Sequence, residues 1–191
     1  GNISPLFVAK EISKSEKNRE SLEEFLEELI VRRELAINFI YYNQDYDKFQ
    51  SMTYLWAYET MDKHKNDQKE YVYSLEILEK SETHDKYWNS AQKEMMVTGK
   101  MHGYMRMYWA KKIIEWTEKF EEAYEIIKYL NNKYFIDGRD ENGYAGIAWC
   151  FGKHDRAWNE RNIFGKLRYM NSNGLKRKFD IEKYVEKINK L

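Results

Sequence analysis

The stretch that decides the fold is TGKMHGYMRMYWAKKIIEW, residues 98–116. Its apolar and aromatic positions recur at steps of three and four residues, which is the spacing of one face of an α-helix. These positions are Met101, Met105, Tyr108, Trp109, Ile113 and Trp116. Arg106 lies three residues before Trp109, so its guanidinium should emerge from this face, where an unpaired charge is costly. The sequence predicts a central helix whose arginine has an anionic partner or ligand; the plainer alternative is a core helix with a structural carboxylate.

Composition predicts an all-α fold in one domain, residues 1–191. The chain contains one proline and nine glycines, and 34% of its residues are charged. Runs of β-branched residues joined by hairpin turns are missing, and no Pro-, Gly- or Ser-rich linker divides the chain. We therefore expect a helical bundle around a single core.

Composition also limits the classes of function. Cys150 is the only cysteine, which excludes an internal disulfide and fits a reducing compartment. No apolar run approaches the roughly 20 residues that span a bilayer, and no signal-peptide pattern opens the chain. The histidines at 64, 84, 102 and 154 lack close ligand spacing, so no metal site is expected. We expect a soluble monomer in the cytoplasm, or in the nucleus of a eukaryote.

Charge is unevenly distributed although the net charge is zero. Residues 150–191 contain 11 Lys and Arg against 5 Asp and Glu, so the preceding part is acidic. A basic end on a neutral protein is compatible with a phosphate-binding face. It also occurs on proteins that never touch nucleic acid, so charge alone leaves both possibilities open.

Other stretches predict further helices and one functional loop. Residues 21–42 are expected to form a long helix, with Ser21 as N-cap and Glu24 completing a capping box. Residues 54–64 and 69–80 suggest shorter helices, and His64 is expected at the surface. Residues 137–144, DGRDENGY, are too polar and glycine-rich to continue a helix. The acids of this loop can supply the partner that Arg106 needs.

Four stretches together resemble the class II cyclobutane pyrimidine dimer photolyases, which are flavin-dependent, light-driven DNA repair enzymes. They are FLEELIVRREL (25–35), THDKYWNSAQ (83–92), MHGYMRMYWAKKIIEW (101–116) and LNNKYFIDGRDENGYAGIAWCFGKHDRAWNERNIFGKLRYM (130–170). They follow one another in the order expected for that family. The resemblance covers nearly the whole chain from about Asn2, and implies the C-terminal helical part of an FAD-binding domain of the photolyase/cryptochrome superfamily. The family's N-terminal antenna domain and the first helices of its flavin domain are not expected in these residues.

The resemblance implies a set of flavin-binding and electron-transfer residues. Ser4, before a helix-starting proline, matches a serine near the flavin phosphates. Arg106 and Asp137 match residues at the flavin's polar edge, with Asp140 adjoining. Asn131 matches the asparagine near the reactive flavin nitrogen, although it could also cap a helix end. The tryptophans that match the family's electron-transfer triad are Trp88, Trp109 and Trp116; periodicity alone favours a structural role for them.

The resemblance also implies residues that hold DNA containing a pyrimidine dimer. Glu28 matches the glutamate that hydrogen-bonds the dimer; a solvated glutamate in an acidic helix start is the alternative. Arg32 occupies a position where the family commonly has tryptophan, and arginine can stack and pair with phosphate. Further matches are Met107 and Tyr104 at the repair site, Trp149 as a DNA contact, and Arg156 and Arg168 on the DNA backbone. Lys153, Lys166, Lys176, Arg177 and Lys178 either extend this basic face or form a solvated tail.

The function implied by the resemblance is light-dependent repair of cyclobutane pyrimidine dimers by electron transfer from reduced FAD, a lyase reaction. A non-catalytic DNA-binding or light-sensing relative is the alternative. The substitution at Arg32 favours this alternative, whereas Arg106, Asp137, Asn131 and the tryptophans favour the enzyme.

Overall fold

The computed structural model describes residues 2–14 and 18–191. The described part is helical and contains no β-strand, only an isolated bridge between Arg161 and Gly165. The all-α prediction is therefore confirmed. Among the described helices, none is long and apolar enough to cross a membrane.

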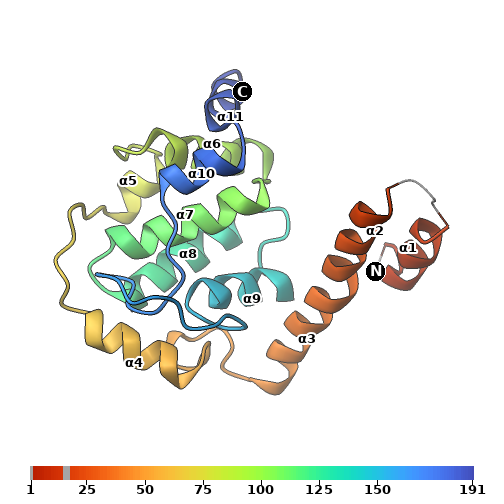
Figure 1. The fold of residues 1–191 in the computed structure, drawn as a ribbon, viewed down its shortest axis with the longest axis horizontal. Helices are drawn as coiled ribbons and strands as arrows, with labels where there is room; N and C mark the ends of the chain where they lie inside the picture. The colour runs from red at the N-terminus through yellow and green to blue at the C-terminus, as the bar shows by residue number, and fades with distance from the viewer. Residues whose placement is uncertain (1, 15–17) are drawn as a thin grey trace.

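The helices form a body and a projecting arm (Figure 1). The arm and its base contain α1 (Pro5–Ile12), α2 (Arg19–Leu26), a π-helical segment (Glu27–Arg32) and α3 (Arg33–Tyr42). The body contains a 3₁₀ turn (Phe49–Ser51), α4 (Leu55–His64), α5 (Leu75–Glu79), α6 (Lys86–Thr98), α7 (Gly103–Trp116), α8 (Phe120–Tyr134), α9 (Glu141–Cys150), α10 (Ser172–Lys178) and α11 (Ile181–Asn189).

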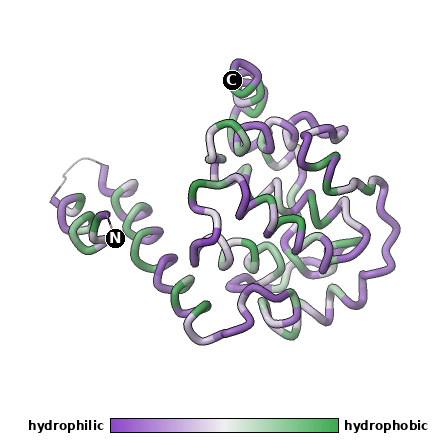
Figure 2. The backbone as a smooth tube through the Cα atoms, turned by 180° about the vertical axis from the view of Figure 1, so that it is seen from behind, coloured by the Kyte–Doolittle hydropathy of each residue, from purple (hydrophilic) through white to green (hydrophobic). Residues whose placement is uncertain are grey.

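Helix α7 is the centre of the core, as its periodicity predicts. It contacts α6, α8 and α9, and its residues Met105, Tyr108, Trp109, Ile113 and Trp116 are all buried. The hydropathy of the tube changes within each helix of the body, which is the pattern of amphipathic helices packed around a common interior (Figure 2). Burial of these large side chains supplies the main stabilisation of the body.

The predicted start of α7 is wrong, because the stretch from residue 98 contains a helix end and a new start. Thr98 closes α6, and Gly99 adopts a left-handed backbone with φ +69° as its C-cap. A Cβ atom on Gly99 would lie 2.6 Å from Cγ1 of Ile136. The α7 helix then begins at Gly103, after His102 as N-cap. The chain needs this break because α6 and α7 pack side by side.

The long helix predicted over residues 21–42 is present in three parts, but its start is different. Asn18, not Ser21, is the N-cap, and its Oδ1 accepts a hydrogen bond from the Ser21 N–H at 3.2 Å. The capping box of Ser21 and Glu24 is therefore wrong. Regular α-helix also gives way to a π-helical segment over Glu27–Arg32. Such segments often occur at functional sites.

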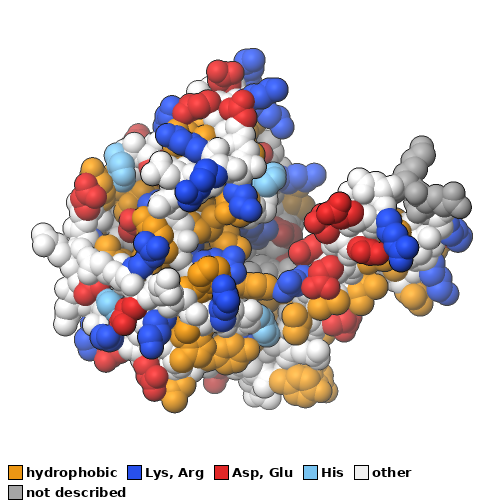
Figure 3. Space-filling model, in the orientation of Figure 1, with side chains coloured by type: hydrophobic (Ala, Val, Ile, Leu, Met, Phe, Trp, Pro, Cys, Tyr) orange, Lys and Arg blue, Asp and Glu red, His pale blue; other side chains and the backbone are white. Residues whose placement is uncertain are grey.

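The arm differs from the body in burial. None of the described residues of α1, α2 or the π-helical segment is buried. Apolar side chains are exposed along it, including Leu6, Phe7, Phe25 and Ile30. Acidic side chains gather on the arm, whereas Lys and Arg are spread over the visible face of the body (Figure 3). Only α3, through its contacts with α9, is packed firmly against the body.

The helix predicted over residues 69–80 is mostly wrong, because only Leu75–Glu79 is helical. The preceding residues cover the end of α7: the Tyr73 N–H donates to the Trp116 carbonyl at 3.0 Å. Lys69 donates to the carbonyls of Ile114 and Thr117. Burial lowers the pKa of Lys69 to about 8. This segment is extended because it satisfies the last carbonyls of α7.

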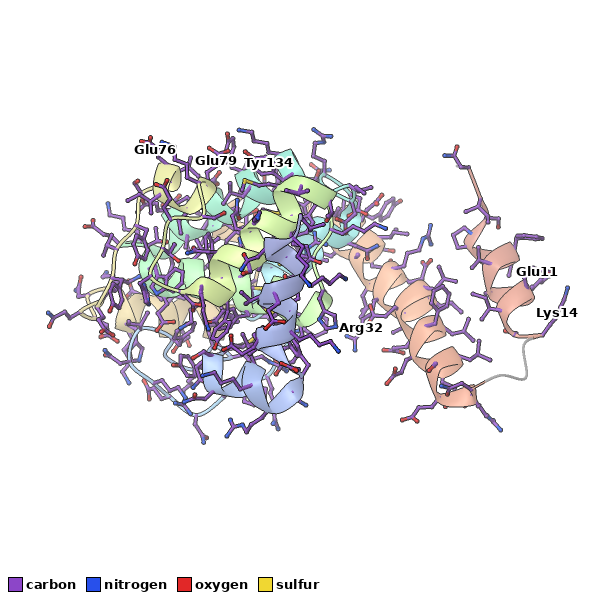
Figure 4. All side chains as sticks on the ribbon, turned by 90° about the horizontal axis from the view of Figure 1, so that it is seen from above. Glu11, Lys14, Arg32, Glu76, Glu79 and Tyr134 are labelled. Carbon is purple, nitrogen blue, oxygen red and sulfur yellow. The ribbon has the colours of Figure 1, made fainter. Side chains whose placement is uncertain are left out.

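Glu79 links the short helix α5 to α8 through hydrogen bonds. Its Oε1 accepts hydrogen bonds from Lys133 Nζ at 2.7 Å and from the Tyr134 hydroxyl at 2.8 Å. The labelled side chains of Glu79 and Tyr134 lie together on the body, far from the arm (Figure 4). The bond from Lys133 is the main cause of the lowered pKa of Glu79.

The loop predicted over residues 137–144 is correct only in its first half. Asp140 is the N-cap of α9, and its Oδ1 accepts from the Gly143 N–H at 2.6 Å. The helix therefore begins at Glu141 despite the nearby glycine. The N-cap at Ser4 and the helix over residues 55–64 agree with the sequence-based expectations.

Residues 151–171 form a loop, here called the basic loop. Hydrogen bonds hold it against α4 and the residues that follow α4. The Ile163 N–H donates to Asp67 Oδ2 at 2.7 Å, and the Lys166 N–H donates to Thr60 Oγ1 at 2.9 Å. His64 lies between Asp67 and Glu160, at 2.6 and 2.9 Å, with its side chain only 13% exposed. His64 is therefore partly buried in a surface contact between α4 and the basic loop, more covered than the sequence predicts.

Candidate functional site

Two adjoining cavities lie where α7, α8 and α9 meet the arm. The smaller, of about 160 Å³, is lined by α7, α8 and α9. The larger, of about 600 Å³, is lined by the π-helical segment, α3 and α9. Met107, Asn142, Gly146 and Trp149 line both cavities. The two spaces are therefore neighbours that share one wall.

Arg106 forms the polar wall of the smaller cavity. Its NH1 donates to Asp137 Oδ2 at 2.8 Å, and its NH2 donates to Asn131 Oδ1 at 2.6 Å. Its Cζ lies 3.8 Å from the centroid of the Phe135 ring. The side chain remains 30% exposed, so it can still meet a ligand. The anionic partner that the sequence predicts for Arg106 is thus Asp137.

Asn131 is held in one orientation by a chain of polar groups. Its Nδ2 donates to Asn132 Oδ1 at 3.0 Å, and Asn132 Nδ2 donates to the Tyr144 hydroxyl at 3.2 Å. The residue lies in α8 and is 1% exposed. Its side chain orients Arg106 instead of capping the helix, because both of its polar atoms bond to the side chains of Arg106 and Asn132.

The smaller cavity has room for a ring beside its polar wall. Its apolar surface includes Trp109, Ile127 and Ile147. A Cβ atom added at Gly103 or Gly146 would meet nothing within 4 Å, so these glycines leave open space. A planar heteroaromatic group with polar edges fits apolar walls that end at a guanidinium and an amide.

Helix α9 is anchored by a buried lysine that the sequence analysis did not identify. Lys111 is 1% exposed, and its Nζ donates to the Cys150 carbonyl at 2.5 Å, at the last residue of α9. A cation is favourable at a helix C-terminus. Burial lowers the pKa of Lys111 to about 8. Because α9 carries Gly146 and Trp149, this contact fixes the wall shared by both cavities.

The larger cavity brings together Glu28, Arg32, Met107 and Trp149. The Arg32 Cζ lies 4.8 Å from the Trp149 ring, and its NH2 lies 3.4 Å from Glu27 Oε1. In Figure 4 Arg32 lies between the arm and the body. The arginine therefore stacks on a tryptophan in the wall of the larger cavity.

Two buried nitrogens in this cavity wall have no hydrogen-bond partner among the described residues. They are Trp149 Nε1 and His154 Nε2. Burial, assisted by the charges of Lys153 and Arg32, lowers the pKa of His154, so its imidazole is neutral at neutral pH. His154 also has a left-handed backbone, with φ +57°, which is uncommon for a residue other than glycine. Sequence reasoning missed His154 because only the fold brings it to the cavity.

The three tryptophans form a buried series that starts at the smaller cavity. Trp109 lines the cavity, and its Nε1 donates to Gln92 Oε1 at 2.8 Å. Trp88 Nε1 donates to the Trp109 carbonyl at 3.0 Å. The centroids of the Trp88 and Trp116 rings are 5.7 Å apart. Gln92 is a further residue that the sequence analysis missed, since a glutamine in a helix carries no visible signal.

Some matched residues lie outside these cavities. Ser4 caps α1 on the exposed arm, and Asp140 caps α9. Tyr104 packs edge-on against Phe179, 6.4 Å between centroids, and lines neither cavity. Burial raises the pKa of Asp140. The structure therefore gives these three residues local structural contacts.

Arg156 and Arg168 lie in the basic loop, apart from the residues that line the cavities. Arg168 Nε donates to Asp155 Oδ2 at 3.1 Å. Lys153 turns away from this group: its Nζ lies 4.4 Å from the Tyr54 ring and 5.1 Å from the Phe39 ring. Within the described residues, no group of three or more His, Cys, Asp or Glu could hold a metal ion.

Comparison with known proteins identifies the class. No family model matches the chain. A Methanothermobacter thermautotrophicus protein named deoxyribodipyrimidine photo-lyase is 58% identical over 191 residues, which are the whole chain and 42% of the relative. Proteins of the same name from Oryza sativa subsp. japonica and Potorous tridactylus are 51% and 49% identical, over 100% and 98% of the chain and 38% and 37% of their own lengths.

The helical fold and its paired cavities thus occur in a chain related to the photo-lyases. At these identities over nearly all its residues, the chain belongs to the deoxyribodipyrimidine photo-lyase family. It spans about two fifths of the length of these relatives.

Proposed function

We propose that this chain is the C-terminal FAD- and DNA-binding part of a photolyase that repairs cyclobutane pyrimidine dimers in light. The observation that carries the proposal is the smaller cavity. It joins an amide and a guanidinium, the latter fixed by Asp137 from outside the lining, to an apolar wall that contains Trp109. The names of the relatives support DNA repair as the general activity.

The residues of the smaller cavity fit the ring system of FAD. Bound reduced FAD supplies light-driven one-electron chemistry that amino-acid side chains lack. Arg106 would donate to the polar edge of the ring, with Asp137 balancing its charge. Asn131, oriented by Arg106 and Asn132, would hold its amide near the ring nitrogens. Gly146 would let the ring approach α9 closely.

The larger cavity fits a flipped-out pyrimidine dimer beside the flavin site. Glu28 would accept hydrogen bonds from the bases, and Met107 and Trp149 would pack against their faces. Arg32, stacked on Trp149, would present its guanidinium either to a carbonyl or to a phosphate. The unpartnered Trp149 Nε1 and His154 Nε2 give this wall unused hydrogen-bonding capacity.

The buried tryptophans would conduct electrons toward the flavin site. Tryptophan is an oxidisable side chain, and Trp109 adjoins the cavity while Trp88 and Trp116 follow it in the core. With FAD bound, Trp109→Phe should block light-driven reduction of the oxidised flavin by an external reductant. The change keeps most of the apolar volume, so the fold should remain. Photoreduction at the parental rate would assign the tryptophans to packing alone.

The decisive experiment is titration of the purified chain with FAD, followed by its absorption spectrum. Two matched variants control it. Gly146→Leu fills open space in both cavities and should abolish binding. Gly174→Leu makes the same change in α10, away from the cavities, and should leave binding intact. Equal FAD affinity of both variants would contradict the proposed site.

A repair assay distinguishes the enzyme from the alternative function, that of a non-catalytic DNA-binding or light-sensing relative. DNA with a thymine dimer is incubated with the FAD-loaded chain in light and in darkness. Loss of dimers in light only, reduced by Glu28→Gln, supports the photolyase. Binding of FAD and DNA without repair favours the alternative, to which the exposed arm and the substitution at Arg32 lend support.

A further inference from the structure

Trp158, in the basic loop, is a half-buried side chain that the proposed cavities do not use. Two guanidinium groups lie over its ring. The Cζ atom of Arg156 is 4.7 Å from the ring centroid, and the Cζ atom of Arg168 is 4.6 Å from it. The two charged carbons are therefore at most about 9 Å apart. Residues twelve positions apart in the sequence are gathered on one indole.

Hydrogen bonds to residues before and after Trp158 in the basic loop hold the indole in place. The Trp158 backbone N–H donates to the Lys166 carbonyl at 2.9 Å. Its ring Nε1 donates to Asp155 Oδ1 at 3.2 Å, and Arg168 Nε donates to Asp155 Oδ2 at 3.1 Å. One carboxylate thus holds both the ring and one of the arginines lying over it.

Asp155 is ionised in this arrangement, yet it leaves a positive charge unbalanced. Burial would raise the pKa of Asp155, but hydrogen bonds from the Arg156 N–H, Arg168 and Trp158 outweigh it and lower the pKa. Asp155 forms an ion pair with Arg168. Arg156 has no carboxylate within ion-pair distance among residues 2–14 and 18–191, and it is exposed. The group presents net positive charge to solvent.

We propose that Trp158 is a positioning residue that holds Arg156 and Arg168 as a preformed pair for two neighbouring phosphates of one DNA strand. The inference rests on the proposed DNA-binding function. Phosphates of one strand rise about 3.4 Å per nucleotide, so two guanidinium groups no more than about 9 Å apart can meet phosphates that lie within two or three nucleotides of each other. Arginine side chains otherwise lose much rotamer freedom on binding. Stacking on a fixed ring removes part of that cost before DNA arrives.

The salt dependence of DNA binding distinguishes the loss of a charged contact, which changes the slope, from the loss of positioning, which changes only the affinity. Affinity for a short duplex containing a thymine dimer is measured by fluorescence anisotropy between about 50 and 200 mM salt. Trp158→Leu keeps both charges, so we expect about a five- to tenfold weaker affinity and an unchanged salt slope. Arg156→Ala removes a phosphate contact and should flatten the slope by about one unit.

Rescue by a conservative change distinguishes stacking from simple loss of packing. Trp158→Phe retains an aromatic face but not Nε1, and should bind within about twofold of the parental chain. Should Trp158→Leu fail to fold in thermal denaturation, Arg156→Lys decides: lysine keeps the charge but lacks the planar fork, and should weaken binding with the slope unchanged. Parental affinity in Arg156→Lys would then overturn the proposal.

Two other results overturn it. Equal affinities of Trp158→Leu and the parental chain show that the ring does not position the arginines. A Trp158→Phe variant as weak as a folded Trp158→Leu variant shows that the aromatic face is not the cause. Failure of the parental chain to bind DNA overturns the proposed function as well, and is thereby distinguished from failure of Trp158 alone.

Discussion

The two cavities share a wall, but they differ in how their remaining walls are built. The smaller is lined by body helices, and its lining includes buried side chains such as Trp109 and Ile127 and a guanidinium that is hydrogen-bonded before any ligand arrives. The larger depends on the π-helical segment, which has no buried residue. Preorganised groups bind with less loss of conformational freedom. The smaller cavity should therefore hold its ligand in a precise orientation, whereas the walls of the larger one can adapt to their ligand.

The largest expected difference between the two regions is in stability. Ile113→Ala removes a fully buried side chain from α7 and should cost about 3 kcal/mol of the free energy of unfolding. Ile30→Ala makes the same chemical change in the π-helical segment, where the residue is 48% exposed, and should cost less than about 0.5 kcal/mol. Urea denaturation measures both. Similar losses would mean that the arm is packed as firmly as the body.

A smaller effect concerns the ion pair that builds the polar wall. Arg106 and Asp137 are partly exposed, at 30% and 44%, so their coupling should be only about 1 kcal/mol. A double-mutant cycle with Arg106→Ala and Asp137→Ala, read by urea denaturation, should be non-additive by that amount. Additive losses would show that the wall is not preformed, which would remove the contrast with the larger cavity.

The smallest effect is a pH dependence in the contact between α4 and the basic loop. Hydrogen bonds to Glu160 and then Asp67 raise the pKa of His64 above its usual 6.5. Stabilisation from the protonated form is therefore complete below pH 6.5 and is lost as pH rises through the raised pKa. The melting temperature should exceed that of His64→Gln by roughly 2 °C at pH 6 and by less at pH 8.5. A constant difference across this range would contradict the protonated bridge.

Local sequence signals predicted those parts of the fold that depend on local chemistry. The apolar positions of α7 repeat with a helical period, and Ser4 can cap a helix from its own side chain. The extended stretch before α5 could not be predicted in this way, because the carbonyls that it satisfies belong to the end of α7. Gly99 shows the same limitation: its left-handed turn is needed only because α6 and α7 pack together.

The candidate site could be predicted where the chemistry of a residue conflicts with that of its neighbours in the sequence. Arg106 on an apolar helix face requires a counter-charge, which indicated the acids of the loop at residues 137–144 without knowledge of the fold, and the resemblance selected Asp137 among them. Asn131 needed the resemblance to be noticed, since an asparagine near a helix end has ordinary explanations. His154 and Gln92 carried no local signal, because their neighbours in space come from other helices.

The π-helical segment has a geometric consequence for the arm. A π-helical turn spans one more residue than a regular turn, and each residue of an α-helix turns the chain by about 100°. Removing one residue between Glu27 and Arg32 would therefore restore regular winding and leave the direction of α1 and α2 about the axis of α3 nearly unchanged, whereas removing one residue from α3 itself would turn the arm by roughly that angle. The wide turn thus takes up one extra residue of chain without redirecting the arm.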